Sequence, residues 1–301
     1  MKVRIGLALG TQGLRDETAL DGLVDDLERL GFDSLWLSER LTGTAPDPLI
    51  GLAYAAGRTR RLKLGTSVLV LPGRNPAILA KELASLDRLS GGRLLLALGL
   101  GASDPAEHQA FGVASNERGP WVDEVLPLLR RLWTEDRVDH DGSRFHYQGL
   151  TVRPRPIQQP IDLWLGGLAP AALRRIGRVA DGWLPSSCTV AEAAAGREVI
   201  QDAAARAGRT IDPEHFGVIV VYARDGLPAP LVQMLAARRP GVDPADIVPV
   251  GMPALRAMLG RFVDAGFSKF VLRPAAEPTD WTAELEDLAA HVLPLQVTAL
   301  V

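Results

Sequence analysis

Two side chains of opposite charge, Glu39 and Arg40, directly follow an apolar run that begins at Asp33. A carboxylate beside a guanidinium can bind a ligand or move a proton, and it can equally form a structural ion pair. No second carboxylate stands at the end of a neighbouring apolar run, so the paired acids of a glycosidase are not supported. Glu39 and Arg40 are therefore weak candidates for catalysis, and the catalytic residues are otherwise unknown.

Glycines end two further apolar runs, at residues 99–101 and 166–169, and each run is followed by a predicted helix start at a proline. Glycine lets a ligand approach the backbone closely, and a helix N-terminus favours an anion. A single Gly-x-Gly is weak and lacks the third glycine of the dinucleotide fingerprint. The two segments together make phosphate binding and a purely structural role equally good interpretations.

Other classes of chemistry find no support. The five histidines show no HxH or HExxH spacing, and Cys188 is the only cysteine, so the sequence predicts no metal site and no disulfide. No basic neighbour of Cys188 is evident that would lower its pKa, which argues against a reactive thiol. With 33 Lys+Arg against 36 Asp+Glu, the net charge of −3 indicates no nucleic-acid partner. No apolar window is long enough for a membrane span, and no leader pattern opens the sequence, so a cytoplasmic protein is expected.

The predicted strands and helices that position these residues recur at a regular spacing along the sequence. Apolar runs begin at Val3, Asp33, Lys63 and Arg93, each 30 positions after the last, with amphipathic segments between them. Such runs predict buried parallel strands joined by helices. The rhythm resumes with strands predicted at 161–165, 181–184, 216–222 and 269–273. Eight units predict a (β/α)₈ TIM barrel with its site at the carboxyl ends of the strands, and a doubly wound sheet is the alternative.

Two excursions interrupt this rhythm, at about 103–160 after the fourth strand and about 224–250 after the seventh. The first contains predicted helices at 104–111 and 121–133, then a polar, turn-rich stretch at 135–160. This stretch has too little apolar content for a core of its own, so it is an excursion and not a linker between domains. Strand starts 30 residues apart leave no room for a linker. We therefore expect one domain over 1–301.

A joint set of motifs resembles the bacterial luciferase-like flavin and deazaflavin oxidoreductases. The motifs include LGTSVLVLP from Leu64, RNP from Arg74, LDRLSGGR from Leu86, the glycines at 99 and 101, VRPRP from Val152, and DGWLP from Asp181. The resemblance covers most of the chain and thins between about Arg224 and Val250. It implies a (β/α)₈ barrel that holds FMN or the deazaflavin coenzyme F420 at its mouth.

The resemblance also implies a cis peptide bond between Ser67 and Val68, with Val68 against the back of the tricyclic ring. The residues that it places near the cofactor are Glu39, Ser67, Val68, Leu69, Gly99, Leu100, Gly101, Gly166, Gly167, Leu168, Ala169, Ser186 and Ser187. Of these, the glycine-rich segments would approach the phosphate, and Glu39 would lie near the ring edge.

The function that we expect is hydride transfer between reduced F420 and a small organic substrate. F420 is favoured over FMN because residues 65–69 look closest to deazaflavin-dependent members. An FMN-dependent monooxygenase is the alternative within the family, and a non-catalytic flavin-binding barrel is a further one. Arg40 stands where sugar-phosphate dehydrogenases of this family carry a catalytic His, and Ala102 and Pro105 stand where they carry Glu and Asn. The substrate is not predicted. The family is often dimeric, so a homodimer is one assembly to test.

Overall fold

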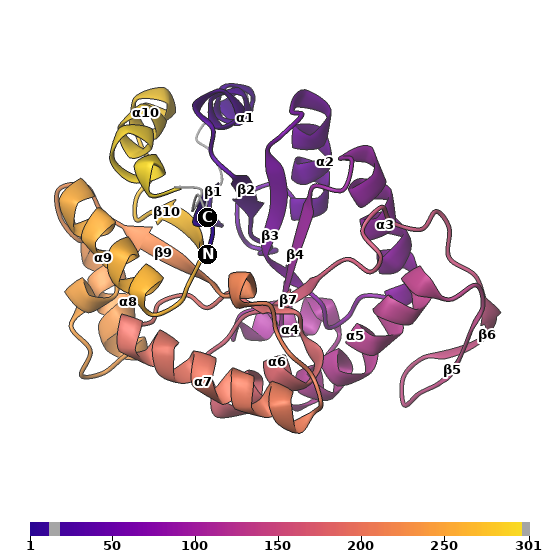
Figure 1. Cartoon of the computed structure of the whole chain (residues 1–301). Coiled ribbons are helices and arrows are strands. Elements are labelled where there is room, and N and C mark those ends of the chain that lie inside the picture. Colours follow the sequence, from indigo (N-terminus) through magenta and orange to yellow (C-terminus); the bar gives the residue numbers. More distant parts are fainter. Residues whose placement is uncertain (12–18, 297–301) are drawn as a thin grey trace.

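The computed structural model describes residues 1–11 and 19–296. Its parallel strands form one eight-stranded sheet in the order β8-β7-β4-β3-β2-β1-β10-β9. Isolated bridges from Trp183 to Phe216 and from Ser186 to Ile219 join the two end strands, β8 and β9. The sheet therefore closes into the predicted TIM barrel, and helices surround it (Figure 1). The doubly wound alternative is wrong.

The bounds of the elements follow the predicted rhythm closely. The barrel strands are β1 (Arg4–Ala8), β2 (Ser34–Leu37), β3 (Lys63–Val70), β4 (Leu94–Gly99), β7 (Leu163–Leu165), β8 (Gly182–Trp183), β9 (Gly217–Tyr222) and β10 (Lys269–Pro274). The α-helices are α1 (Ala19–Leu30), α2 (Pro48–Arg58), α3 (Pro76–Leu89), α4 (Pro105–Phe111), α5 (Arg118–Thr134), α6 (Pro170–Val179), α7 (Val190–Arg206), α8 (Ala229–Arg238), α9 (Met252–Asp264) and α10 (Trp281–Val292). Short 3₁₀ turns cover Ser115–Glu117, Pro213–His215, Pro244–Asp246 and Leu293–Leu295.

Three helices that lead away from the barrel mouth begin with the same device. The side chains of Asp47, Asn75 and Asp104 accept hydrogen bonds from the first free backbone N–H groups of α2, α3 and α4, and a proline follows each of them. Proline suits the first helical position because it has no N–H group to leave unpaired. The helix starts are thus fixed locally by the sequence.

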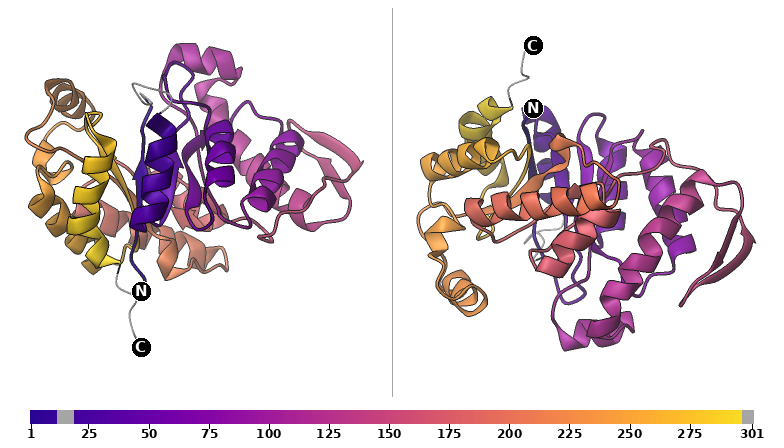
Figure 2. Two further views of the ribbon diagram at one scale, coloured as in Figure 1. Left: turned by 90° about the horizontal axis from the view of Figure 1, so that it is seen from above. Right: turned by 60° about the horizontal axis from the view of Figure 1, so that its bottom comes forward.

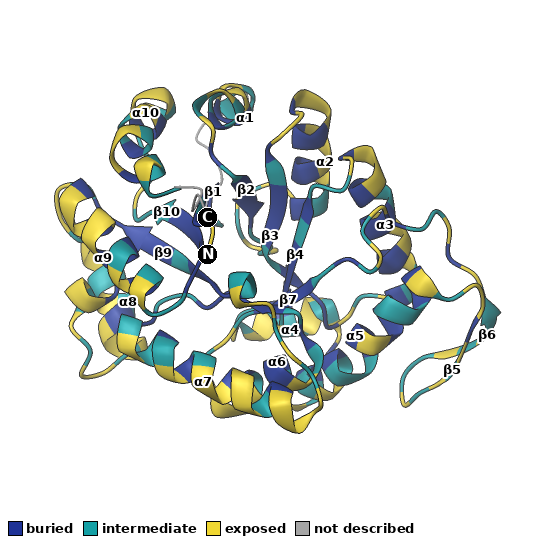
Figure 3. Cartoon of the chain, in the orientation of Figure 1, coloured by how far each residue is buried: buried dark blue, intermediate teal, exposed yellow. Residues whose placement is uncertain are grey.

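The core has two layers. Inside the barrel, side chains that include Trp36, Trp164 and Val271 pack on one another. Between the strands and the helices lies a larger cluster, which includes Trp183. Figure 3 shows the strands largely buried and the outer faces of the helices exposed. Because side chains alternate along a strand, Val271 facing inward means that Lys269 and Arg273 of β10 also face inward.

Charged residues close the bottom of the barrel, opposite the mouth. The carboxylate of Asp33 lies 3.4 Å from Nζ of Lys269, 3.3 Å from Nζ of Lys63 and 4.0 Å from the guanidinium of Arg4. Burial alone would raise the pKa of Asp33, but these positive charges outweigh it and hold the pKa below its ordinary value. This cluster ties β1, β3 and β10 to the loop before β2.

Both predicted excursions contain additional secondary structure. The polar stretch in the first forms an antiparallel hairpin of β5 (Val138–Asp141) and β6 (His146–Leu150), which projects away from the barrel in both views of Figure 2. The second contains α8 and a 3₁₀ turn, and it has a small apolar cluster of its own around Leu235 and Val248.

Candidate functional site

The end of β3 is irregular where the barrel opens. The peptide bond between Ser67 and Val68 is cis, as the resemblance implies. The register with β4 shifts between Ser67 and Leu69, which is a β-bulge. Ser67 and Val68 are half-buried, whereas the side chain of Leu69 is fully buried in the core. Any contact of Leu69 with a ligand in the mouth would therefore come from its backbone.

Val68 is the centre of a group of predicted site residues. A Cβ atom added to Gly99 would lie 2.4 Å from Cγ2 of Val68, and one added to Gly166 would lie 3.8 Å from Cγ1. Ser38, which sequence reasoning did not select, donates a 2.8 Å hydrogen bond from its hydroxyl to the carbonyl of Ser67. The structure therefore brings together the bulge of β3 and the carboxyl ends of β4 and β7.

Glu39 supports the bulge from the side of β2. Its carboxylate forms an ion pair with Arg74 and accepts a 2.7 Å hydrogen bond from the backbone N–H of Val70, and its own N–H donates to the carbonyl of Val68. Burial raises the pKa of Glu39 above its ordinary value, although Arg74 acts in the opposite direction. Glu39 thus holds the backbone on both sides of Leu69.

Arg40, the other weak catalytic candidate, is held in a second ion pair. Its Nη2 donates a 3.1 Å hydrogen bond to Asp104, and its Nε lies 3.5 Å from Oε1 of the buried Glu107. Both acids belong to the start of α4. Arg40 therefore links the end of β2 to the helix that follows β4.

An arginine from α5 supports the glycine-rich end of β4. Arg118 is 3% exposed and donates a hydrogen bond to the carbonyl of Leu100. Gly101 has a φ of +84°, and a Cβ atom there would lie 2.6 Å from Nη1 of Arg118. Glycine is needed at position 101 for both reasons. Sequence reasoning did not select Arg118.

The remaining predicted residues gather around Arg239, at the end of α8. Arg239 donates a 2.6 Å hydrogen bond to the carbonyl of Ser187 and pairs with Glu192 of α7. It lines a hollow of about 540 Å³ together with Leu168 and Ala169, next to Gly167. The hydroxyls of Ser186 and Ser187 lie 3.5 Å apart at the same edge. Sequence reasoning missed Arg239 because it lies in the excursion where the resemblance thins.

A hollow of about 230 Å³ opens over the ends of β1, β9 and β10. It is lined by Leu9, Gly10 and Thr11 after β1, by Val221, by Leu231 and by residues 273–277 and 281. Arg273 is the charged residue that enters it from a barrel strand. Sequence reasoning placed Arg273 at the end of the last strand and assigned it no role.

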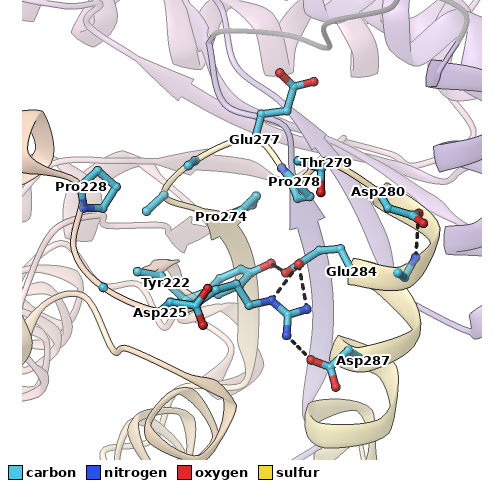
Figure 4. A pocket seen from close by; sticks show the side chains of 16 residues that line it. Tyr222, Asp225, Pro228, Pro274, Glu277, Pro278, Thr279, Asp280, Glu284 and Asp287 are labelled. Atoms are coloured by element: carbon cyan, nitrogen blue, oxygen red, sulfur yellow. Dashed lines mark hydrogen bonds and ion pairs between the residues drawn. The ribbon is translucent and has the colours of Figure 1, made fainter.

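A larger hollow of about 560 Å³ lies outside the strands, between the ends of β9 and β10 and helix α10 (Figure 4). Here Arg224 pairs with Glu284 and Asp287, and the hydroxyl of Tyr222 donates to Glu284. Burial and the carboxylate of Glu284 raise the pKa of Tyr222. The charged side chains of this cluster are paired with one another, so size alone does not make it the reactive site.

Several sequence predictions concern absent features. The thiol of Cys188 is buried, and burial raises its pKa to about 12, in keeping with the expectation of an unreactive thiol. Within residues 1–11 and 19–296, no group of three or more His, Cys, Asp or Glu side chains could hold a metal ion. Over the same residues, no helix has the length and apolar character to cross a membrane.

The protein is a (β/α)₈ barrel whose polar and glycine-rich candidate site lies at the carboxyl ends of the strands, as in TIM-barrel enzymes. The family model of luciferase-like monooxygenases matches residues 3–247, so the chain belongs to this family. The resemblance drawn from the motifs is thereby confirmed.

Relatives of similar sequence have the name F420-dependent glucose-6-phosphate dehydrogenase. The one from Kineococcus radiotolerans is 33% identical over 194 residues, which span 60% of this chain and 57% of that protein. The one from Intrasporangium calvum is 35% identical over 188 residues, 58% of this chain and 54% of that protein. These matches span little more than half of each relative. A longer match, to the protein of Beutenbergia cavernae, is 29% identical and covers 89% of this chain and 90% of that protein.

Solved structures share the fold. Monooxygenase RslO1 from Streptomyces bottropensis aligns with a TM-score of 0.79 and 24% identity over 98% of this chain and 100% of that chain. The coenzyme F420-dependent tetrahydromethanopterin reductase from Methanopyrus kandleri aligns with a TM-score of 0.79 and 20% identity, over 98% and 99%. At these identities the likeness concerns the architecture alone.

Proposed function

We propose that this protein is an oxidoreductase that binds coenzyme F420 at the barrel mouth and transfers a hydride between it and a small organic substrate. The observation that carries the proposal is the grouping of Val68, Gly99 and Gly166 around the bulge of β3, at the position where the resemblance expects the tricyclic ring. The names of the relatives favour F420 over FMN. The reduced deazaflavin supplies the hydride when bound, and the protein supplies orientation and electrostatics.

The donor set fits the proposed cofactor. At the ring end, Val68 would support the ring, Ser67 and Gly166 would flank it, and Glu39 would hold the bulge in place. At the tail end, the hydroxyls of Ser186 and Ser187 lie 3.5 Å apart and would donate to a phosphate, while Arg239 holds the backbone carbonyl of Ser187 and is itself paired with Glu192. Leu100 and Gly101 would approach the phosphate from β4, and Gly167, Leu168 and Ala169 from β7.

Equilibrium titration of the purified protein with F420 and, separately, with FMN tests the choice of cofactor. We expect F420 to bind in the micromolar range and FMN to bind more weakly. Micromolar binding of FMN without binding of F420 would favour the monooxygenase alternative. Steady oxidation of reduced F420 with a panel of acceptors would exclude a non-catalytic barrel.

Ser187 offers a matched pair of variants for the tail end. Its φ is 55°, a conformation that Asp and Asn both tolerate. Ser187→Asp places a negative charge at the proposed phosphate position, and we expect it to weaken F420 binding about tenfold or more. Ser187→Asn has the size of the Asp variant without its charge, and it is expected to bind F420 within about threefold of the parent. Equal affinities of the two variants would contradict the proposed position.

Two expectations from the sequence stay predictions. One is that residues 1–301 form a single domain, which limited proteolysis tests. The other is a homodimer, which sedimentation analysis tests.

A further inference from the structure

The arginines around the barrel mouth differ in whether a protein group pairs with them, and even Arg118, which has no acid partner among the described residues, donates to the carbonyl of Leu100. Arg40, Arg74, Arg224 and Arg239 each form an ion pair with an aspartate or glutamate. Arg273 forms no hydrogen bond or ion pair with any of the described residues, and its Nε is buried without a partner. Burial lowers the pKa of Arg273, and no neighbouring charge among the described residues opposes this.

Arg273 also lies at the end of the barrel where the candidate site is. It is the inward-facing residue two places after Val271, which packs inside the barrel, so it lies at the top of the barrel interior. In the sheet order, β2 and β1 separate its strand from β3. Arg273 therefore lies three strand positions round the barrel from the bulge at Val68, at the same end of the strands.

The surroundings of Arg273 indicate what it would bind. Apolar side chains, among them Leu9, Val221 and Leu231, line part of the hollow. Trp281 lines it too, and its indole Nε1 is a second buried donor without an acceptor among the described residues. A buried donor without a partner costs free energy, and a guanidinium suits the two oxygens of an oxyanion. Glu277 lines the same hollow but forms no ion pair with Arg273, and Figure 4 shows its carboxylate pointing away from the cluster at Glu284.

We propose that Arg273 binds the anionic end of the substrate, and that the substrate is a small carboxylic acid with an apolar body. The position of the cofactor in this proposal rests on the proposed function, whereas the anion site does not. One guanidinium balances one carboxylate, whereas a phosphate monoester carries about −1.5 to −2 charges. One guanidinium therefore matches the charge of a carboxylate better than that of a phosphate monoester.

Calorimetric titration in phosphate-free buffer of constant ionic strength tests the proposal. The probes are benzoate, its neutral analogue benzamide, and phenyl phosphate. We expect the parent protein to bind benzoate more tightly than either of the others. Arg273→Gln should weaken benzoate binding about tenfold or more, Arg273→Lys should weaken it less, and neither should alter benzamide binding. Arg178→Gln, on the exposed surface of α6, is the matched control and should bind like the parent.

Three outcomes would overturn the proposal. The first is unchanged benzoate affinity in Arg273→Gln. The second is tighter binding of phenyl phosphate than of benzoate, which would indicate a phosphate ester instead. The third is a loss of F420 binding in Arg273→Gln with benzoate binding intact, which would assign Arg273 to the cofactor. If the parent protein binds benzoate through Arg273 but does not bind F420, the proposed function fails and the anion site stands.

Thermal unfolding separates a binding role from a structural one. A buried cation without a counter-ion is unfavourable in the folded protein. We therefore expect Arg273→Met to melt at the same temperature as the parent or higher. Added benzoate should raise the melting temperature of the parent and not that of the variant. A lower melting temperature of Arg273→Met without ligand would show that Arg273 serves the fold and would overturn the proposal.

Discussion

At the scale of single residues, the site depends on which side chains are missing as much as on which are present. Gly99 has no side chain because Val68 fills the space where its Cβ would be, 2.4 Å away. Val68 is β-branched and stiff at χ1, so it cannot easily turn aside. The bulge of β3 and the end of β4 are therefore shaped by one contact.

Gly99→Ala should destabilise the protein by about 1–3 kcal/mol, because the added methyl group overpacks the contact with Val68. The double variant Gly99→Ala/Val68→Ala should lose less stability than the sum of the two single changes, since the clash is then removed. Urea unfolding measures both effects. Gly260→Ala is the control, because a Cβ atom at position 260 meets nothing within 4 Å. Equal stabilities of the Gly99 and Gly260 variants would contradict this account.

At the bottom of the barrel, Asp33 is the counter-ion that Arg4, Lys63 and Lys269 share. Asp33→Asn should cost about 3–5 kcal/mol at neutral pH, because Lys269 and Lys63 are left without a counter-ion. Since the pKa of Asp33 is lowered in the folded state, its stabilising effect is present above the unfolded pKa and is lost as pH falls through the folded one. The unfolding free energy of Asp33→Asn should thus depend less on pH in the acid range. Recovery of stability in Asp33→Asn/Lys269→Met would support the cause, and a fully stable single variant would refute it.

At the scale of elements, the sequence predicted the long strands well and the polar ones poorly. Strands β3 and β10 begin at the predicted residues, Lys63 and Lys269, because continuous apolar runs leave little choice of position. The hairpin of β5 and β6 was not predicted because its residues are mostly polar. The hairpin is held by long-range contacts that no local pattern contains.

Glu124 of α5 is the main source of those contacts. Its carboxylate accepts hydrogen bonds from the hydroxyl of Ser143 and from the backbone N–H groups of Arg144 and Phe145, and it lies 3.1 Å from Nε2 of His140. Although burial opposes them, these donors lower the pKa of Glu124 to about 2. One carboxylate thus binds the tip of the hairpin, next to the packing of Phe145 on Trp121 and the ion pair of Arg144 with Glu117.

Glu124→Ala should leave the barrel folded and accelerate tryptic cleavage at Arg144, because the tip of the hairpin loses its acceptor. Asp141→Ala is the control, since the pair of Asp141 with His146 is exposed and weak. In the parent protein, the stabilisation by Glu124 should be complete above its unfolded pKa of about 4.5 and should disappear as pH falls through about 2. A cleavage rate that the Glu124 change leaves unaltered would exclude this attachment.

At the scale of the whole molecule, the barrel is closed unevenly. Strands β3 and β4 pair along six positions, whereas β8 contains two residues and meets β9 only through isolated bridges. Beyond β8, the N–H of Ile219 still donates a 2.8 Å hydrogen bond to the carbonyl of Pro185. Few hydrogen bonds therefore hold the join between β8 and β9.

Native-state hydrogen exchange should detect this difference. The amide of Ile219 should exchange through local opening, at a lower free energy than the amides of Thr66 or Leu96 in the β3–β4 pair, which should exchange only with global unfolding. Exchange at all three positions with one free energy would show that the barrel opens as a single unit.

The site itself could be predicted only in part. Its backbone positions follow from the fold, because glycines at strand ends must lie at the mouth once the strands are parallel. Whether a charge is paired does not follow, since it depends on partners far along the chain. Arg74 and Arg273 both stand near strand ends, yet one meets Glu39 and the other meets no acid among the described residues. The distinction is visible only in three dimensions.

Because the join between β8 and β9 is weak, binding of a cofactor there would be coupled to the folding of the barrel by mass action. Ser186 is both a proposed cofactor contact and the partner of Ile219 across the join between β8 and β9. A ligand held there would oppose the opening of that join, so binding and closure would share one free energy. A ligand at about 100 times its dissociation constant stabilises a folded protein by about 2.7 kcal/mol. The melting temperature of this protein would then serve as a gauge of cofactor concentration.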